Sequence, residues 1–199
     1  MMRRHRGLTL IELLVAVAVL AVVVAVAAPS FKSLIEVQRL RSINSQLITD
    51  LQFARNEAVT RGALLRVVFD TNANVTCYSL FTSAGTALQA ANALRCDCRA
   101  GPGAACNGIA GATEVRTVSI PKSLGVLVLP LDAVSGVAFD PATGGLLSIP
   151  TDNVSAPMPQ FRVQAALDAP RRLFNVLNQA GRPSVCSPAG STLGAAACP

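Results

Sequence analysis

The sequence predicts an α+β protein in which one long N-terminal helix packs on an antiparallel β-sheet or sandwich head. Three observations lead to this prediction. Apolar residues fill almost all of 8–28, and apolar spacing typical of a helix continues over 29–62. From residue 63 to 199 the pattern changes to short apolar segments separated by Gly, Pro, Asn and Asp, which is typical of strands and turns. A chain of 199 residues has room for this helix and one such head.

Residues 1–7 form a basic leader, and 8–28 predict a single transmembrane helix. Those 21 residues would extend about 31 Å as a helix, which matches a hydrocarbon core of about 30 Å. The arginines before the apolar run predict a cytoplasmic N-terminus, with the rest of the chain on the opposite side of the membrane. Glu12 lies inside this segment, where a charge costs about 2.5–3.5 kcal/mol, so we expect it to have a partner.

An alternative is that the N-terminus is an ordinary secretory signal peptide. Ala25-Val26-Ala27 would then be its small-residue cleavage site. Two observations favour the retained helix: Glu12 interrupts the start of the apolar run, and the helical pattern continues beyond the supposed cut.

The helical pattern of 29–62 is amphipathic. Its apolar residues form one stripe, whereas most charged residues, Asp50 among them, are expected to point away from it. Gly62 is a plausible C-terminal stop, and Pro29 predicts a kink because proline removes a backbone donor. The predicted stripe consists of Leu40, Ile43, Leu47, Leu51, Ala54 and Ala58.

The head is predicted to contain eight strands, with a hairpin turn at 140–145. Because no helical pattern intervenes, the strands suggest an antiparallel sheet or sandwich. They are Leu64–Asp70, Val75–Phe81, Thr113–Ile120, Gly125–Leu129, Gly136–Asp140, Leu146–Ile149, Gln160–Leu167 and Arg172–Asn178.

All six cysteines lie beyond the apolar run, which favours disulfides in an oxidising compartment. Cys186 and Cys198 most simply pair and close the C-terminal loop 186–198. The other four are Cys77 and the three cysteines of the long loop 83–112, namely Cys96, Cys98 and Cys106. Their three possible pairings remain open. A soft-metal site in that loop is less favoured, because it lacks a second close cysteine pair and a histidine.

The sequence also argues against an enzyme. The single histidine, His5, lies in the leader, so a chain cleaved after Gly7 has no imidazole for a catalytic triad. No phosphate-binding glycine loop or catalytic carboxylate pair is recognisable. We therefore predict no catalytic residues, no cofactor and no metal.

The run Gly7-Leu8-Thr9-Leu10-Ile11-Glu12-Leu13 resembles the signal of type IV prepilins and type II secretion pseudopilins. The resemblance implies that a prepilin peptidase cuts between Gly7 and Leu8 and methylates Leu8, although the usual first residue is Phe. It also implies that Glu12 guides entry into a filament, where the free amino terminus of a neighbouring subunit neutralises its charge. Pro29 matches the helix-kinking proline of the family.

A second resemblance narrows the group. Residues 50–62, Asp-Leu-Gln-Phe-Ala-Arg-Asn-Glu-Ala-Val-Thr-Arg-Gly, are similar to the end of the long helix in FimT/GspH minor pilins and pseudopilins. The two resemblances cover 1–62. They imply a minor subunit of a type II secretion or type IV pilus system, anchored in the bacterial inner membrane with a periplasmic head. The expected partners are other pilin or pseudopilin subunits, the prepilin peptidase and the inner membrane.

Two alternatives remain open. Some FimT-like minor pilins bind DNA during natural transformation through a C-terminal Gly-Arg motif. Gly181-Arg182 keeps the start of that motif but lacks its second arginine, and Arg171 and Arg172 lie one strand away. The net charge of +6 falls to +3 without the leader, which is weak for a nucleic-acid interface. The other alternative is a secreted periplasmic domain without a role in a filament.

Overall fold

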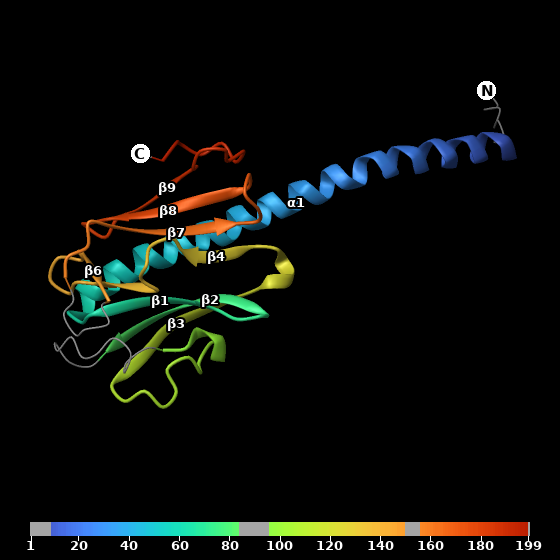
Figure 1. Cartoon of the computed structure of the whole chain (residues 1–199). Helices are drawn as coiled ribbons and strands as arrows, with labels where there is room; N and C mark the ends of the chain where they lie inside the picture. The colour runs from blue at the N-terminus through green and yellow to red at the C-terminus, as the bar shows by residue number, and fades with distance from the viewer. Residues whose placement is uncertain (1–8, 84–95, 150–155, 199) are drawn as a thin grey trace, which may run out of the picture.

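The computed structural model describes residues 9–83, 96–149 and 156–198, apart from the side chains of 26–30 and 83. It confirms the α+β prediction: one long helix, α1 (Leu10–Arg61), packs on two antiparallel sheets. Figure 1 shows the first half of α1 projecting from the head, while its second half lies among the strands.

The head contains a five-stranded sheet, in the order β3-β2-β1-β5-β6, and a four-stranded sheet, in the order β4-β7-β8-β9. All pairings between these strands are antiparallel. The strands of the larger sheet are β1 (Leu65–Thr71), β2 (Val75–Ser83), β3 (Ala112–Pro121), β5 (Gly136–Phe139) and β6 (Leu146–Ser148). Those of the smaller sheet are β4 (Leu127–Pro130), β7 (Gln160–Ala166), β8 (Arg172–Asn178) and β9 (Pro183–Cys186). The described residues also form two 3-10 helices, η1 (Cys98–Ala100) and η2 (Lys122–Leu124).

The eight predicted strands are all present, with ends shifted by at most two residues. The turn at 140–145 is also confirmed, because the Asp140 N–H donates to the Gly145 carbonyl between β5 and β6. β9 was not predicted. It starts with Pro183 and pairs with β8 alone, so it lies at the edge of its sheet, where a proline can be accommodated.

The amphipathic stripe of α1 forms the centre of the core, as predicted. Five of its six residues are fully buried, and Ile43 is partly buried against them. The same cluster contains side chains from both sheets, for example Phe69 of β1 and Phe161 of β7, whose ring centroids are 5.9 Å apart. The helix ends at Gly62, whose φ of 59° suits a residue without a Cβ.

Asp50 is a correction to the sequence analysis, because it points into the core and is only 1% exposed. The Tyr78 hydroxyl of β2 donates to its Oδ2 at 2.7 Å, and Arg116 Nη1 of β3 lies 2.9 Å from its Oδ1. A buried carboxylate is tolerated when it is paired in this way. Burial is the main influence on the carboxyl and raises the pKa of Asp50.

A second buried polar contact joins α1 to the smaller sheet. Asn175 of β8 donates from Nδ2 to Oδ1 of Asn44 at 2.8 Å and to the Val163 carbonyl at 3.3 Å. Both asparagines are buried. Hydrogen bonds in a core lose their partners if the helix slides, so the Asp50 and Asn44 contacts fix the register of α1 on both sheets.

The outer face of the larger sheet carries the disulfide-bonded loop. Disulfides join Cys77 to Cys98 and Cys96 to Cys106. Glu114 of β3 supports the loop, because its carboxylate accepts hydrogen bonds from the backbone N–H groups of residues 103 and 105. A third disulfide joins Cys186 to Cys198, the pairing expected for the C-terminal loop. All six cysteines are therefore paired in disulfides.

The buried Asp50 predicts a specific pH dependence of stability. Since its pKa is raised in the folded state, the folded chain holds this proton more tightly than the unfolded chain, whose carboxyl has the ordinary value near 3.8. Its contribution to stability is present at low pH and is lost as pH rises from about 4 through the raised pKa. The free energy of unfolding of the wild type, minus that of Asp50→Asn, should therefore fall with pH over this window.

Urea unfolding of the detergent-solubilised chain at a series of pH values measures this difference. The difference should be constant above the raised pKa. If it instead increases with pH from 4 upward, pairing with Arg116 outweighs burial and the assignment is wrong.

Candidate functional site: the projecting helix

The first half of α1 exposes apolar side chains on all sides. Every described side chain over 9–25 and 31–35 is exposed, including Leu10 at 78%, Val22 at 65% and Phe31 at 67%. A helix that packs on its own domain keeps its apolar residues on one face. This segment therefore presents apolar surface that the rest of the described chain does not cover.

Several sequence predictions reach beyond the described residues. The cleavage site between Gly7 and Leu8 lies outside them, and so does the start of the predicted span 8–28. Among the described residues, no helix combines the length and apolar character needed to cross a membrane.

Glu12 closes the first turn of α1 onto Thr9. The Thr9 N–H and hydroxyl donate to Glu12 Oε2 at 2.8 and 2.9 Å, and the Glu12 N–H donates to Thr9 Oγ1 at 3.3 Å. This reciprocal arrangement is a capping box, which satisfies backbone donors that have no partner inside the helix. The sequence analysis missed Thr9, although the Thr-x-x-Glu pattern is a known signal for such a cap.

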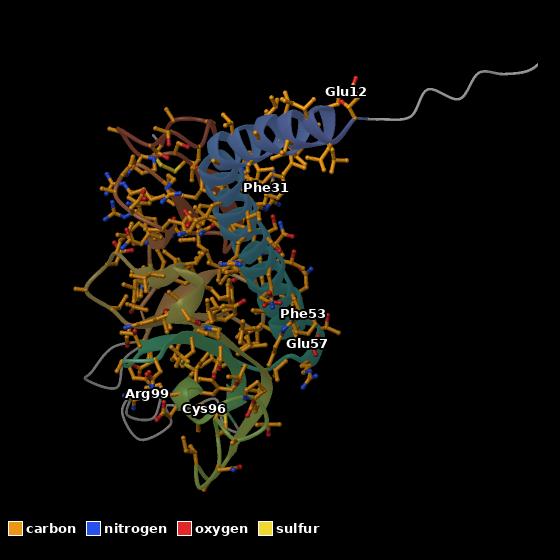
Figure 2. The ribbon with its side chains drawn as sticks, turned by 90° about the vertical axis from the view of Figure 1, so that its right-hand side faces the viewer. Glu12, Phe31, Phe53, Glu57, Cys96 and Arg99 are labelled. Carbon is orange, nitrogen blue, oxygen red and sulfur yellow. A yellow bond between two sulfur atoms is a disulfide. The ribbon has the colours of Figure 1, made fainter. Side chains whose placement is uncertain are left out.

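The capping box leaves the charge of Glu12 unneutralised. Both bonds from Thr9 go to Oε2, and within the described part of the chain no cation pairs with this carboxylate. Figure 2 shows Glu12 at the end of α1 that is farthest from the head. A cation that neutralises it must therefore come from outside the described residues.

Helix α1 is continuous through Pro29, so the proline does not break it. Figure 2 shows the helix changing direction close to Phe31, where it approaches the head. A change of direction at this point agrees with the kink expected from a proline, whose ring crowds the preceding turn.

An ion-pair network holds α1 where it leaves the head. Arg171 Nη1, in the turn between β7 and β8, lies 2.7 Å from Glu36 Oε2 of α1, and its Nη2 lies 2.6 Å from Asp168 Oδ2. Hydrogen bonds from Arg171 lower the pKa of Asp168, and both carboxylates raise the pKa of Arg171. Arg39 adds a hydrogen bond to the Leu124 carbonyl of η2 at 3.2 Å.

The three candidate DNA-binding arginines do not form one cluster. Arg171 is paired with two carboxylates, as described above. Arg172 donates to the Ala189 carbonyl at 3.4 Å and lies over the Phe174 ring, 5.8 Å from its centroid. Arg182 is exposed beyond the other end of β8, about 20 Å away at the rise of a β-strand.

The Gly181-Arg182 pair has a structural explanation. Gly181 has a φ of 72°, and a Cβ at this position would lie 2.2 Å from the Gly144 carbonyl oxygen. The Arg182 N–H donates to Asn178 Oδ1 at 3.0 Å. The turn from β8 to β9 therefore requires a glycine, whereas the arginine side chain has no partner within the described residues.

Two family models match this chain. The model for the prokaryotic N-terminal methylation motif matches residues 2–28. The model for type II transport protein GspH matches residues 44–181, which is more than half of the chain. No curated protein gives a significant match.

Two solved structures with a similar fold are crystal structures of the type IV minor pilin FimU from Pseudomonas aeruginosa. In one crystal form, the match has a TM-score of 0.50 and 18% identity, and covers 76% of this chain and 90% of FimU. In the other, the TM-score is 0.47 and the identity 17%, with 74% and 92% covered. At this identity the first match supports the fold alone.

Substitutions at 181 and 182 should separate a turn requirement from a DNA contact. Gly181→Ala should lower the free energy of unfolding by about 2 kcal/mol, because it combines a positive φ with a backbone clash. Arg182→Ala should change stability by less than about 0.5 kcal/mol, as is usual for an exposed side chain. In a gel shift at physiological salt, the Gly181→Ala and Arg182→Ala chains should leave the mobility of duplex DNA the same as the wild-type chain does.

Urea unfolding and gel shift of the same purified chains provide the measurements. A wild-type shift that Arg182→Ala abolishes would contradict this interpretation and restore the DNA-binding one.

Proposed function

Because the chain belongs to the type II transport protein GspH family, we propose that it is a minor pseudopilin or minor pilin of a periplasmic filament. The parent machine would be a type II secretion or type IV pilus system. The observation that supports this most is the uncovered apolar half of α1 with a carboxylate at its start.

The apolar half of α1 needs a cover that the chain does not supply. Fully burying a Val, Leu, Ile or Phe side chain stabilises by about 1.5–3 kcal/mol relative to leaving it in water. With more than a dozen such side chains exposed between 10 and 35, this segment has a strong driving force to enter lipid or a bundle of similar helices. We propose that it does both in turn: first as a membrane anchor over 8–28, then in the filament core.

Glu12 would select between these two environments. Its carboxylate is costly in lipid unless a cation neutralises it. In a bundle of processed subunits, the amino terminus of a neighbouring helix supplies such a cation close to the start of α1. The bonds from Thr9 occupy Oε2, so Oε1 is free of intramolecular hydrogen bonds within the described residues and can accept this partner.

Processing by the prepilin peptidase would create that amino terminus. The match of 2–28 to the N-terminal methylation motif supports cleavage between Gly7 and Leu8 with methylation of Leu8. Cleavage also removes Arg3, Arg4 and Arg6 from the cytoplasmic side of the helix. The proposed topology is single-pass in the bacterial inner membrane, with a cytoplasmic N-terminus and a periplasmic head.

The head would then be carried on the filament in a fixed orientation. Buried contacts of Asp50 and Asn44, together with the Glu36–Arg171 pair, join α1 to both sheets. Movement of the helix bundle is therefore transmitted to the head. The alternative role as a DNA-binding subunit has less support, because the candidate arginines are separated and one of them is already paired.

Substitutions at Glu12 should separate its charge from its capping role. Glu12→Gln keeps a side chain that can complete the capping box but removes the charge. If the charge pairs with a neighbouring amino terminus, both Glu12→Gln and Glu12→Ala should reduce the amount of this subunit in the filament fraction. We expect roughly a tenfold loss, the change that about 1.4 kcal/mol of lost pairing would produce.

Thr9→Ala is the matched control, since it removes the cap and keeps the charge, and it should assemble. Intact mass of each membrane-extracted chain should show loss of 1–7 and gain of one methyl group, so that a processing defect is distinguished from an assembly defect. Normal incorporation of Glu12→Gln would contradict the proposed role of the charge.

A further inference from the structure

The two disulfides of the larger sheet have an interleaved connectivity. The first four cysteines in chain order are Cys77, Cys96, Cys98 and Cys106. The structure joins the first to the third and the second to the fourth. A single residue, Asp97, separates the second cysteine from the third. If Cys96 and Cys98 exchange partners, the wrong bonds Cys77–Cys96 and Cys98–Cys106 form, and these close loops of almost the same length as the native bonds.

The unfolded chain does not favour the native pairing. The native bonds close sequence separations of 21 and 10 residues, whereas joining consecutive cysteines closes 19 and 8. Because the probability of loop closure falls as the 3/2 power of length, the consecutive pairing is favoured by about 1.6-fold. An exported head also presents its cysteines in chain order, so the first meets the second before the third arrives.

Packing in the folded head selects the native pairing instead. Cys96 is 1% exposed and lies in the apolar cluster on the outer face of the sheet, beside Val68 and Phe81. Cys98 and Cys77 are fully buried next to this cluster. Joining Cys96 to Cys77 would remove Cys96 from its apolar site. Cys77, Cys96 and Cys98 are all buried once the loop has packed, so wrong bonds that involve them must be exchanged before that stage.

We propose that maturation of this chain requires a thiol–disulfide isomerase of the compartment that receives its head, in addition to the dithiol oxidase that forms its disulfides. The inference depends on the proposed delivery of the head to an oxidising compartment. The isomerase would be a maturation partner in addition to the filament subunits and the peptidase.

The exchange balances without a further oxidant. A catalyst thiolate attacks Cys96 in a wrong Cys77–Cys96 bond, which forms a mixed disulfide and releases the Cys77 thiolate. That thiolate attacks Cys98 in the wrong Cys98–Cys106 bond, which forms Cys77–Cys98 and releases the Cys106 thiolate. Finally the Cys106 thiolate attacks Cys96 in the mixed disulfide, which forms Cys96–Cys106 and regenerates the catalyst. Two wrong disulfides are converted into two native ones, so no net oxidation occurs in these steps. The oxidase accepted the electrons earlier, when the wrong disulfides formed.

The position of Asp97 allows a direct test. The full chain is produced in cells with and without their periplasmic isomerase, free thiols are alkylated, and the unreduced chain is cut before aspartates. Cleavage at Asp70, Asp97 and Asp132 gives peptides 70–96 and 97–131. The native pairing links the two peptides, whereas the consecutive pairing closes a bond within each and leaves them separate. An additional tryptic cut after Arg95 and Arg99 distinguishes the third possible pairing.

Without the isomerase, the linked fraction should fall to about two fifths or less, the share set by the 1.6-fold preference for consecutive pairing. Equal linked fractions in both strains would overturn the inference. Finding all six cysteines alkylated would overturn the proposed periplasmic head as well, which is a different result from wrong disulfides.

Two matched controls test whether the interleaving is the cause. In Cys96→Ser/Cys106→Ser and in Cys77→Ser/Cys98→Ser, only one upstream pair remains, so no wrong upstream partner exists. The surviving bond should form equally in both strains, as should Cys186–Cys198, which joins consecutive cysteines in the native chain. If the surviving bond of either variant depends on the isomerase as strongly as the wild type does, the connectivity is not the cause.

Discussion

The first half of α1 exposes leucine, valine and phenylalanine side chains around its whole circumference and begins with a carboxylate that has no cation nearby in the described structure. Such a segment is stable only where lipid or other helices cover it and where the carboxylate is neutralised. The need for a cover and for a cation explains why this half of the helix lies outside the head. The second half of α1 shares one core with the two sheets, and the first half extends from it toward surroundings that other molecules provide.

The head is joined to the helix by polar contacts that have little freedom to rearrange. Tyr78 and Arg116 hold Asp50 on one side, and Asn175 holds Asn44 on the other. Apolar packing alone tolerates small sliding movements, whereas a buried polar group that loses its partner costs about 1–3 kcal/mol. These contacts therefore fix one helix register. A filament subunit needs a fixed register between helix and head, because neighbouring subunits hold the helix and the head must keep a constant position relative to it.

Much of this arrangement could be predicted from periodicity. The stripe from Leu40 to Ala58, the stop at Gly62 and eight strands follow from the spacing of apolar residues and the positions of turn formers. The family resemblance was likewise carried by local motifs, and the GspH model agrees with it. β9 was missed because it is short, begins with proline and has an exposed Val185.

Other features depend on the fold and could not be predicted. Asp50 was expected to point away from the core, because its partners Tyr78 and Arg116 are distant in sequence and come close only when β2 and β3 pair. The disulfide pairing was open for the same reason. Arg171, Arg172 and Arg182 are close in sequence, with only one strand between them. The structure nevertheless places Arg172 and Arg182 at opposite ends of β8. Thr9 is different, since its capping pattern was visible and was overlooked.

The proposed filament role requires that helices of other subunits cover the first half of α1. It is tested most directly by placing a photoreactive amino acid at Leu20 of the full chain, in cells that assemble its filament. Leu20 is 62% exposed and lies far from the head, so the label should leave the fold intact. Irradiation of the filament fraction should crosslink this position to other subunits that carry an apolar N-terminal helix. Crosslinks to lipid alone in that fraction would contradict it.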